Sequence, residues 1–308
     1  MLDAGFVLDA EARRRLIDRF GPGVEPWCVQ LPALVEHYGL RWGLELDTAL
    51  SGGTSRLFAG WQRWAGWQRA GRRVILKLTP DPAIADGEAR ALSAWAATPH
   101  AVNLLDSDPG SGVLLLEELT PGTKLSEQPE LPPLTDVADL LTALRNAPPV
   151  GSGRLPSLSE RVDFLFSLVG RHHTNPRVAR LVTADLVYRS RDAARILAVG
   201  GPAGLVHGDL HPGNVLDAGP GRGLVAIDPR PCVGDPDFDA VDWALARAVS
   251  TDEITRRIAC LGDLVPGLDT GRVWRWCTAT AVIIAIQQLR FRPPSVTTRL
   301  LTRLAASP

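Results

Sequence analysis

The sequence predicts an α+β protein of two lobes, a sheet-based N-terminal lobe and a mostly helical C-terminal lobe. The first third of the chain alternates short aliphatic runs with turn residues, a pattern typical of strands. From Pro132 onward, longer segments with helical periodicity and N-capping residues dominate. With 308 residues the chain is long enough for two lobes. We expect residues 1–118 to form the N-terminal lobe, residues 119–308 the C-terminal lobe, and residues 117–123 the hinge.

Two helices and a strand are expected at the N-terminus. Asp9 can accept a hydrogen bond at the start of a helix over residues 10–20, which Gly21 ends. A second helix is expected over residues 31–38, and strand-like sequence follows at residues 44–50. We interpret the two helices as an extension that precedes the sheet of the first lobe.

A lysine and a glutamate are expected on consecutive elements of the first lobe. Residues 73–79 are rich in β-branched and aliphatic residues and predict a strand that carries Lys77 within its apolar alternation. Asp81 then opens a helix that runs to about Ala97 and carries Glu88. Further strands are expected over residues 101–105 and 112–119.

The second lobe is expected to be helical except near its centre. One helix start carries the capping box Ser157-x-x-Glu160, in which each side chain accepts a hydrogen bond from the other residue's backbone N–H. The expected helices cover residues 135–146, 159–171, 176–199 and the chain from about Asp239, and the expected short strands lie around Leu205, Val215 and residues 224–227.

The composition is that of an ordinary globular protein and excludes several classes of partner. Hydrophobic residues make up 45% of the chain and charged residues 22%. The 33 basic and 34 acidic residues nearly balance, so the charge suggests neither nucleic acid nor an anionic membrane as a partner. The longest strongly apolar stretch, residues 279–286, is far shorter than the roughly 20 residues of a membrane span. Four dispersed cysteines and the lack of an apolar signal core at the N-terminus favour a cytoplasmic protein. We also expect the protein to be a monomer.

The most specific signal is a polar motif between aliphatic runs. Residues 206–216 read VHGDLHPGNVL, and Ile-Asp-Pro follows at residues 227–229. The spacing of Asp209, Asn214 and Asp228 matches the His-x-Asp-x-x-x-x-Asn loop of kinases and their downstream metal-binding Asp. Phosphoryl transfer needs a carboxylate for the attacking hydroxyl and oxygen ligands for Mg²⁺ on the nucleotide phosphates. We therefore expect Asp209 to be the catalytic residue, and Asn214 and Asp228 to be the metal ligands.

Other residues are expected to bind the nucleotide, ATP. Lys77 would neutralise the α and β phosphates and would itself be held by Glu88. The Ser-Gly-Gly-Thr-Ser turn at residues 51–55 offers amides and hydroxyls to phosphates, although it departs from the Gly-x-Gly-x-x-Gly pattern. A solvated lysine, an exposed helix glutamate and an ordinary hairpin turn are the structural alternatives. The expected nucleotide-binding residues are Ser51, Gly52, Gly53, Thr54, Ser55, Lys77, Glu88, Glu117 and Leu119.

Two further patterns suggest other chemistry. His207, Asp209 and His211 alternate, and their types suit a zinc hydrolase. However, Pro212-Gly213 breaks the strand, and no third His or Cys ligand follows with a recognisable spacing, so we expect His207 to brace the loop through hydrogen bonds. The glycine-rich residues 219–223 look like part of a dinucleotide fingerprint, but they precede a strand, which predicts a hairpin turn.

The motifs together resemble the aminoglycoside phosphotransferase superfamily of kinase-like enzymes. HGDLHPGNVL, followed by AIDPRPCVGDPDFDAVDW, is similar to the streptomycin 6-phosphotransferase and hydroxyurea phosphotransferase branch. The resemblance implies a bilobal protein-kinase-like fold with an antiparallel N-terminal sheet, and the use of ATP and Mg²⁺. It supports the roles given above for the motif residues. For Asp235 and Asp239 it implies structural roles in the turn after the metal-binding Asp.

The resemblance also implies a small hydroxylated acceptor, and streptomycin at its 6-hydroxyl is the leading one. A cationic antibiotic needs acidic partners, yet no acid lies between Asp269 and the C-terminus. The alternatives are a kinase of another hydroxylated metabolite or antibiotic, of the hydroxyurea or viomycin type, and a non-catalytic nucleotide-binding relative. Candidate acidic partners of the acceptor are Asp163, Asp185, Asp242, Asp252, Glu253, Asp263 and Asp269.

Overall fold

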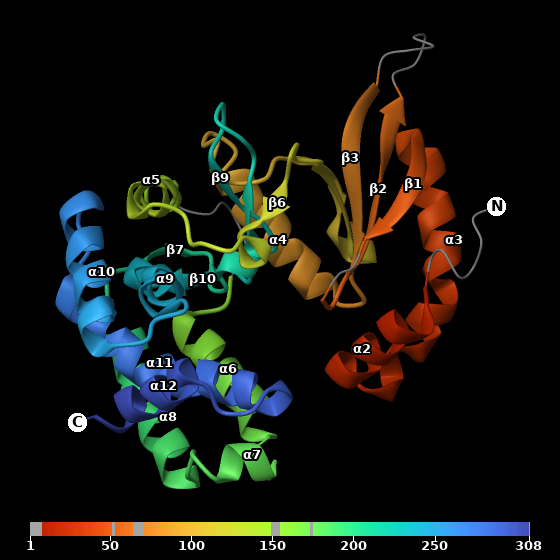
Figure 1. The fold of residues 1–308 in the computed structure, drawn as a ribbon. Coiled ribbons are helices and arrows are strands. Elements are labelled where there is room, and N and C mark those ends of the chain that lie inside the picture. The colour runs from red at the N-terminus through yellow and green to blue at the C-terminus, as the bar shows by residue number, and fades with distance from the viewer. Residues whose placement is uncertain (1–7, 51–52, 64–70, 149–154, 173–174, 308) are drawn as a thin grey trace. The chain divides into compact units, whose positions relative to one another are not determined.

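The computed structural model describes residues 8–50, 53–63, 71–148, 155–172 and 175–307, which fall into two compact units (Figure 1). The first unit comprises the chain up to residue 96 and residues 102–120, and the second comprises residues 97–101 and the chain from residue 121 onward. The short segment 97–101 belongs to the second unit because Ala101 forms a β-bridge with Ala226. None of the helices within the described ranges is long and apolar enough to cross a membrane.

A five-stranded sheet forms the first unit together with three helices (Figure 1). The strands follow the order β1-β2-β3-β5-β4, and every neighbouring pair is antiparallel. The strands are β1 (Leu44–Leu50), β2 (Arg56–Arg63), β3 (Gly71–Leu78), β4 (Leu104–Asp108) and β5 (Val113–Glu117). The helices are α2 (Ala10–Phe20), α3 (Glu25–Trp42) and α4 (Pro82–Ala94).

Capping residues set the starts of two of these helices, as the sequence predicts. The Asp9 carboxylate accepts a hydrogen bond from the Ala12 backbone N–H at 2.7 Å, and the Asp81 carboxylate accepts one from Ala83 at 3.0 Å. Helix α3 is longer than the expected residues 31–38, because its buried face extends along the sheet as far as Trp42. The strand expected at residues 101–105 begins only at Leu104, since the preceding residues turn to the second unit.

The core of the first unit lies between α3 and one face of the sheet. Leu31, Val35 and Tyr38 of α3 are buried against aliphatic side chains from the central strands. The strand residues of this cluster are Phe58, Val74, Leu76, Leu78, Val113 and Leu115.

Lys77 lies on the other face of the sheet. It stands between Leu76 and Leu78 in β3, so the alternation of strand side chains turns it away from α3. There the Lys77 ammonium contacts the Glu88 carboxylate of α4, with Nζ at 2.7 Å from Oε1 and 2.6 Å from Oε2. The two side chains are 4% and 0% exposed, so this ion pair is buried.

Helices dominate the second unit, and one of them is surrounded by the others. Helix α11 contacts α8, α9, α10 and α12 and buries residues on all its sides, including Trp276 and Ile283. The helices are α5 (Leu134–Arg145), α6 (Leu158–Gly170), α7 (Pro176–Ala179), α8 (Ala184–Val199), α9 (Val241–Leu245), α10 (Thr251–Leu264), α11 (Thr270–Phe291) and α12 (Val296–Ala306).

Two small antiparallel sheets carry the polar motif of the second unit. Strand β7 (Gly204–Val206) pairs with β10 (Cys232–Gly234), and β8 (Val215–Asp217) pairs with β6 (Thr123–Lys124) and β9 (Leu224–Ala226). The turn between β8 and β9 contains Gly219 and Gly223, both with positive φ. The hairpin predicted for the glycine-rich segment is therefore confirmed.

The two units match the predicted fold class, an antiparallel N-terminal sheet and a mostly helical remainder. One expected helix differs: residues 176–199 form α7 and α8, two helices separated by a short break. Thr183 causes the restart, because its hydroxyl accepts a hydrogen bond from Leu186 N at 3.1 Å as the cap of α8.

Glu88→Ala is expected to lower the free energy of unfolding by about 3–5 kcal/mol, since it leaves the Lys77 ammonium buried without its carboxylate. Asp86→Ala is the matched control, because Asp86 forms a partly exposed i,i+4 pair with Arg90 on the same helix. That pair should contribute only about 0.3–0.5 kcal/mol. Urea unfolding of both variants measures the difference, and equal losses would contradict a stabilising role for the buried pair.

Candidate active site

Gly208 allows the polar motif at residues 206–216 to lie close to the backbone of Arg230. The motif begins after β7 with His207 and Gly208, and Gly208 has a φ of +75°. A Cβ atom at this position would lie 2.3 Å from the carbonyl oxygen of Arg230. Only glycine tolerates both the left-handed conformation and this close contact, so the local geometry requires glycine at position 208.

Both carboxylate oxygens of Asp209 have partners on other residues. Oδ1 accepts a hydrogen bond from Arg161 Nη2 at 3.0 Å, and Oδ2 accepts one from Asn214 Nδ2 at 3.2 Å. Asn214 Nδ2 also donates to the Asp209 carbonyl oxygen at 2.9 Å, which closes the loop between the two residues. The side chain remains 33% exposed, so a reacting group can reach this oriented carboxylate.

Arg161 is a residue of this site that sequence reasoning missed. It lies in the first turns of α6, whose start is fixed by the predicted capping box of Ser157 and Glu160, now confirmed. Besides Asp209, it contacts the Gly208 carbonyl oxygen through Nε at 2.9 Å. Burial lowers the pKa of Arg161, and the Asp209 carboxylate opposes this effect. No motif spacing joins positions 161 and 209, so the sequence held no signal for this contact.

Local pairing explains why α6 reaches the motif. Ser157 forms a β-bridge with Val233, and Val233 N donates to the Pro156 carbonyl oxygen at 2.9 Å. Val233 belongs to β10, which pairs directly with β7 just before the motif. The start of α6 is thereby joined to the strand pair that carries His207.

His207 is a brace of the loop, as expected. It is fully buried, with Nε2 at 3.2 Å from the Ile227 carbonyl oxygen, and Nδ1 accepts a hydrogen bond from Asp209 N at 3.3 Å. Burial lowers the pKa of His207 to about 4, so the ring is neutral at physiological pH. Across the described parts of the chain, no group of three or more His, Cys, Asp or Glu side chains is arranged to hold a metal ion. The geometry therefore gives no support to the zinc-hydrolase alternative.

A buried carboxylate holds the start of the motif. Asp239 accepts hydrogen bonds from His207 N at 2.7 Å and from Gly208 N at 2.9 Å, one on each oxygen. Burial raises the pKa of Asp239 to about 7, and the two backbone hydrogen bonds act in the opposite direction. The structural role implied for this residue thus consists in fixing the backbone immediately before Asp209.

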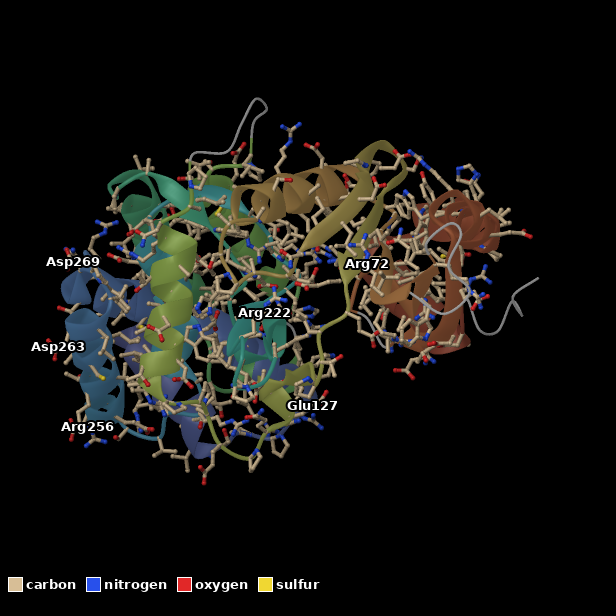
Figure 2. All side chains as sticks on the ribbon, turned by 90° about the horizontal axis from the view of Figure 1, so that it is seen from above. Arg72, Glu127, Arg222, Arg256, Asp263 and Asp269 are labelled. Carbon is tan, nitrogen blue, oxygen red and sulfur yellow. The ribbon has the colours of Figure 1, made fainter. Side chains whose placement is uncertain are left out.

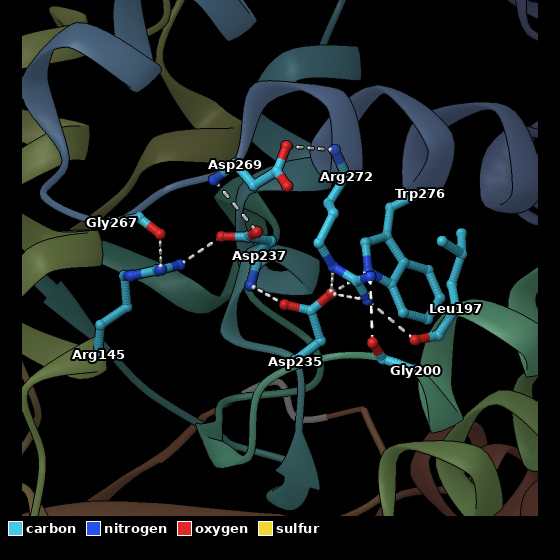
Figure 3. A network of polar contacts seen from close by, with 9 residues as sticks. All are labelled: Arg145, Leu197, Gly200, Asp235, Asp237, Gly267, Asp269, Arg272 and Trp276. Carbon is cyan, nitrogen blue, oxygen red and sulfur yellow. Dashed lines mark hydrogen bonds and ion pairs between the residues drawn. The ribbon is translucent and has the colours of Figure 1, made fainter.

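The turn that carries Asp239 is itself tied to three helices (Figure 3). The carboxylate of Asp235 accepts hydrogen bonds from Arg272 Nε at 2.7 Å and from Trp276 Nε1 at 2.8 Å, both on α11. Asp237 accepts a hydrogen bond from Arg145 Nη1 of α5 at 2.6 Å. Arg272 also donates to the Leu197 carbonyl oxygen of α8 at 3.0 Å. These buried charges are paired, so the turn is held rigidly.

Asn214 directly precedes β8 and Asp228 follows β9, so both lie at the open end of the β8–β9 hairpin. The two segments are paired, since Ile227 N donates to the Asn214 carbonyl oxygen at 2.9 Å. Asp228 has a φ of 54°, a left-handed conformation that is uncommon for a residue with a side chain. Its carboxylate lies 3.4 Å from Arg230 Nη2, a second arginine that the sequence did not single out, although it stands in the Asp-Pro-Arg-Pro segment.

The oxygens of Asn214 and Asp228 fit a magnesium site. Asn214 uses its amide nitrogen for Asp209, which leaves the harder amide oxygen as its ligand atom. Mg²⁺ is commonly bound through one or two protein oxygens together with substrate phosphates and waters. A pair of oxygen ligands is therefore chemically sufficient, and the lack of a larger acidic cluster within the described ranges is compatible with it.

The expected nucleotide-binding residues in the first unit are placed as follows. Lys77 and Glu88 form the buried pair described above. Ser51 and Gly52 lie outside the described residues. Just before β2, Gly53 is exposed, Thr54 is half-buried and Ser55 is buried. Glu117 ends β5 and accepts a hydrogen bond from Asn103 N at 2.7 Å. Leu119 is half-buried in the segment that follows β5.

A cavity of about 1090 Å³ opens beside the motif within the second unit. Its walls include His211 and Gly213 of the motif, Asp242 of α9, and the last two turns of α11. His211 itself caps the short turn before Asn214, because its Nδ1 accepts a hydrogen bond from Gly213 N at 2.9 Å. A small molecule in this cavity would lie against the same loop that carries Asp209.

Sequence comparison places the chain among antibiotic resistance kinases. The family model of aminoglycoside/hydroxyurea antibiotic resistance kinases matches residues 41–290. A hydroxyurea phosphotransferase of Kitasatospora aureofaciens is 36% identical over 260 residues, 82% of this chain and 71% of that protein. A streptomycin 6-kinase of Streptomyces glaucescens is 33% identical over 269 residues, 83% of this chain and 82% of that protein.

Solved structures share the fold at low sequence identity. An ethanolamine kinase of Plasmodium vivax superposes with a TM-score of 0.58 at 14% identity, covering 99% of this chain and 96% of that one. Aminoglycoside phosphotransferase APH(4)-Ia superposes with a TM-score of 0.55 at 19% identity, covering 90% of this chain and 99% of that one. The predicted kinase-like fold is confirmed.

The buried His207 is expected to weaken the fold as the pH falls. Below its ordinary pKa of 6.5 the unfolded chain takes up a proton that the folded chain refuses until about pH 4. The contribution of His207 to stability, present in full above pH 6.5, is therefore lost progressively between about pH 6.5 and pH 4, by roughly 3 kcal/mol, while the raised pKa of Asp239 acts in the opposite direction in wild type and variants alike. In His207→Gln this pH-dependent loss should disappear, whereas the control His37→Gln, at an exposed position, should retain it. Urea unfolding at pH 7 and pH 4.5 provides the comparison, and parallel pH profiles for wild type and His207→Gln would show that the ring is not buried neutral.

Proposed function

Because the chain belongs to the aminoglycoside/hydroxyurea antibiotic resistance kinase family, we propose that it transfers the γ-phosphate of ATP to a hydroxyl group of a small antibiotic. The observation that carries this proposal is the arrangement of Asp209, Asn214 and Asp228. It combines an oriented, partly exposed carboxylate with two oxygen ligands on an adjacent hairpin. A protein that only bound nucleotide would have no need of the oriented carboxylate.

Asp209 acts on the acceptor in this scheme. Arg161 and Asn214 fix its two oxygens, so the carboxylate is oriented before the acceptor arrives. The acceptor hydroxyl donates a hydrogen bond to Asp209 and passes its proton to the carboxylate as its oxygen bonds to phosphorus. The bond from the γ-phosphorus to the oxygen of ADP breaks in the same displacement, and ADP leaves with that electron pair. The transition state is loose, so orientation of the hydroxyl contributes more than strong basicity.

Asn214 and Asp228 would hold Mg²⁺, which when bound neutralises charge on the nucleotide phosphates. The left-handed backbone conformation of Asp228 is incompatible with a continuing strand, so β9 ends before this residue. Arg230 lies against the same carboxylate and balances its charge.

Lys77 supplies a positive charge for the α and β phosphates in this proposal. Its ammonium group is fixed by Glu88 rather than free to move, which is the state required of a phosphate-positioning lysine in kinases. Of the turn residues, Thr54 and Ser55 offer hydroxyl and backbone donors at the start of β2. We also propose that Gly53, Glu117 and Leu119 bind the nucleotide, and for these three residues the proposal rests only on their positions in the sequence.

Streptomycin at its 6-hydroxyl is the leading acceptor, and hydroxyurea is the second. Both choices rest on the names of the relatives, which are 33% and 36% identical to this chain. We further propose that the protein acts as a monomer in the cytoplasm, where ATP is plentiful and its four free cysteines stay reduced.

Incubation with Mg²⁺-ATP and a panel of acceptors, including both antibiotics, tests the activity through ADP release and the mass gain of one phosphate on the acceptor. Asp209→Ala should lower the rate by roughly 10²–10⁴-fold. Asp228→Asn should also be nearly inactive, yet folded, because asparagine tolerates the left-handed conformation. Undiminished turnover in Asp209→Ala would refute its catalytic role, and zinc-dependent hydrolysis without nucleotide would refute the whole scheme.

Arg161→Ala should lower kcat by on the order of 10²-fold while the KM for ATP stays nearly constant, because both lost contacts, to the Asp209 carboxylate and to the Gly208 carbonyl oxygen, orient Asp209 and its adjacent backbone. Arg161→Lys should recover part of kcat, since it keeps the charge but not the second contact to Gly208. Arg195→Ala, which removes an exposed arginine paired with Asp163, is the control. An equal fall in kcat for both alanine variants would assign Arg161 a general structural role instead.

A further inference from the structure

The cavity beside the motif has one wall on each of two packed helices. On α11, Ile284, Gln287, Gln288 and Phe291 follow the i, i+3, i+4, i+7 spacing of a single helix face. On α9, Asp242 and Leu245 also line the cavity. His211 to Gly213, which follow Asp209 closely in the chain, contribute to the lining as well. The cavity is therefore built from regular elements that the core of the second unit holds in place.

Asp242 is the acid that the structure selects from the seven candidates. Within the part of the chain that the structure describes, its carboxylate makes no hydrogen bond or ion pair, although it is only partly exposed. Asp163 and Asp185, by contrast, pair with arginines of α8, and Glu253 pairs with Arg257. Asp269 caps α11, and Asp252 and Asp263 are exposed on α10.

An unpaired carboxylate in this place is costly for the free protein. Burial raises the pKa of Asp242, and the Asp209 charge acts in the same direction, while His211 and Arg161 oppose it. A basic group placed beside Asp242 would remove this cost, because a paired buried charge is far cheaper than an unpaired one. The cavity is thus prepared for a cation at this one position.

The rest of the lining is positively charged or neutral. Among the described lining residues Asp242 is the only carboxylate, whereas Arg247 and Arg292 both contribute guanidinium groups. Arg247 donates to the carbonyl oxygens of Pro129 and Gln128 at 2.6 and 2.8 Å, so its charge is not neutralised. The side-chain amides of Gln287 and Gln288 make no hydrogen bonds with other described residues and are available to hydroxyl groups.

We propose that Asp242 binds the basic group of the acceptor, and that the cavity admits a single such group alongside hydroxyls held by Gln287 and Gln288. This inference rests on the proposed function and deepens it, because it defines the acceptor as a hydroxylated molecule with one basic group inside the cavity. Further basic groups of a polycationic antibiotic must point to solvent, since inside they would meet Arg247 and Arg292. Selectivity among acceptors then follows from the number and placement of their basic groups.

Binding can be measured separately from phosphate transfer by calorimetry on the full chain with Mg²⁺ and a non-hydrolysable ATP analogue. The probes are streptomycin, which is basic, and hydroxyurea, which is neutral. Asp242→Asn should weaken streptomycin binding by about 10- to 100-fold, the usual effect of losing a hydrogen bond between charged groups, and leave the binding of hydroxyurea and of the ATP analogue unchanged. Asp263→Asn is the matched control, since Asp263 lies on the outer side of α10 (Figure 2).

A third variant tests the charge balance. Arg292→Gln removes a repulsive charge from an exposed position and should tighten streptomycin binding about two- to fivefold. Equal affinities in Asp242→Asn and Asp263→Asn, an equal loss for hydroxyurea, or a wild-type protein that binds hydroxyurea but not streptomycin would each overturn the inference. All three results leave the proposed function standing, because it is judged by phosphate transfer. Failure of every acceptor to gain phosphate would refute that function even if the binding pattern were as expected.

Discussion

The two hydrogen bonds from the backbone of His207 and Gly208 to the buried Asp239 carboxylate are the constraint on which the loop that carries Asp209 depends. They fix the chain at the point where it must take up a left-handed conformation. Asp239 in turn depends on the ion pairs of Asp235 and Asp237 with α11 and α5. A loop rich in glycine and proline thereby becomes rigid without lying in a regular element itself.

The Asp209 carboxylate is oriented by one partner nearby in the sequence and one far away. Asn214 is a local partner, five residues away, and their contact follows from the turn between them. Arg161 is a distant partner, and its contact requires that α6 start at the β7–β10 pair. The carboxylate is therefore oriented only when the small sheet and the helix have both formed, so its orientation depends on completion of the second unit.

Much of the fold and of the site could be predicted because the signals were local. Asp9, Asp81 and the Ser157 capping box determine helix starts through contacts within three residues, and the glycines at 219 and 223 determine a turn. Lys77 could be assigned to a strand by alternation, and its pairing with Glu88 followed from the next helix. Arg161 and the choice of Asp242 among seven acids could not be predicted, since each depends on contacts between segments far apart in the chain. The break between α7 and α8 was missed because Thr183 stops one periodic pattern and starts another.

The two ends of helix α11 have different surroundings: one contacts the buried Asp235, and the other lines the cavity. Its first turns hold the buried Asp235 through Arg272 and Trp276, where replacing the arginine leaves a charge unpaired and replacing the tryptophan removes a hydrogen bond. Its last turns present Gln287, Gln288 and Phe291 to the cavity, and Gln287 and Phe291 are exposed. The helix has 22 residues, so the two ends are about 30 Å apart along one rigid rod. Substitutions in the distal turns can therefore change the lining of the cavity without touching the contacts to Asp235, so under the proposed function the choice of acceptor and the rigidity of the loop that carries Asp209 can vary separately.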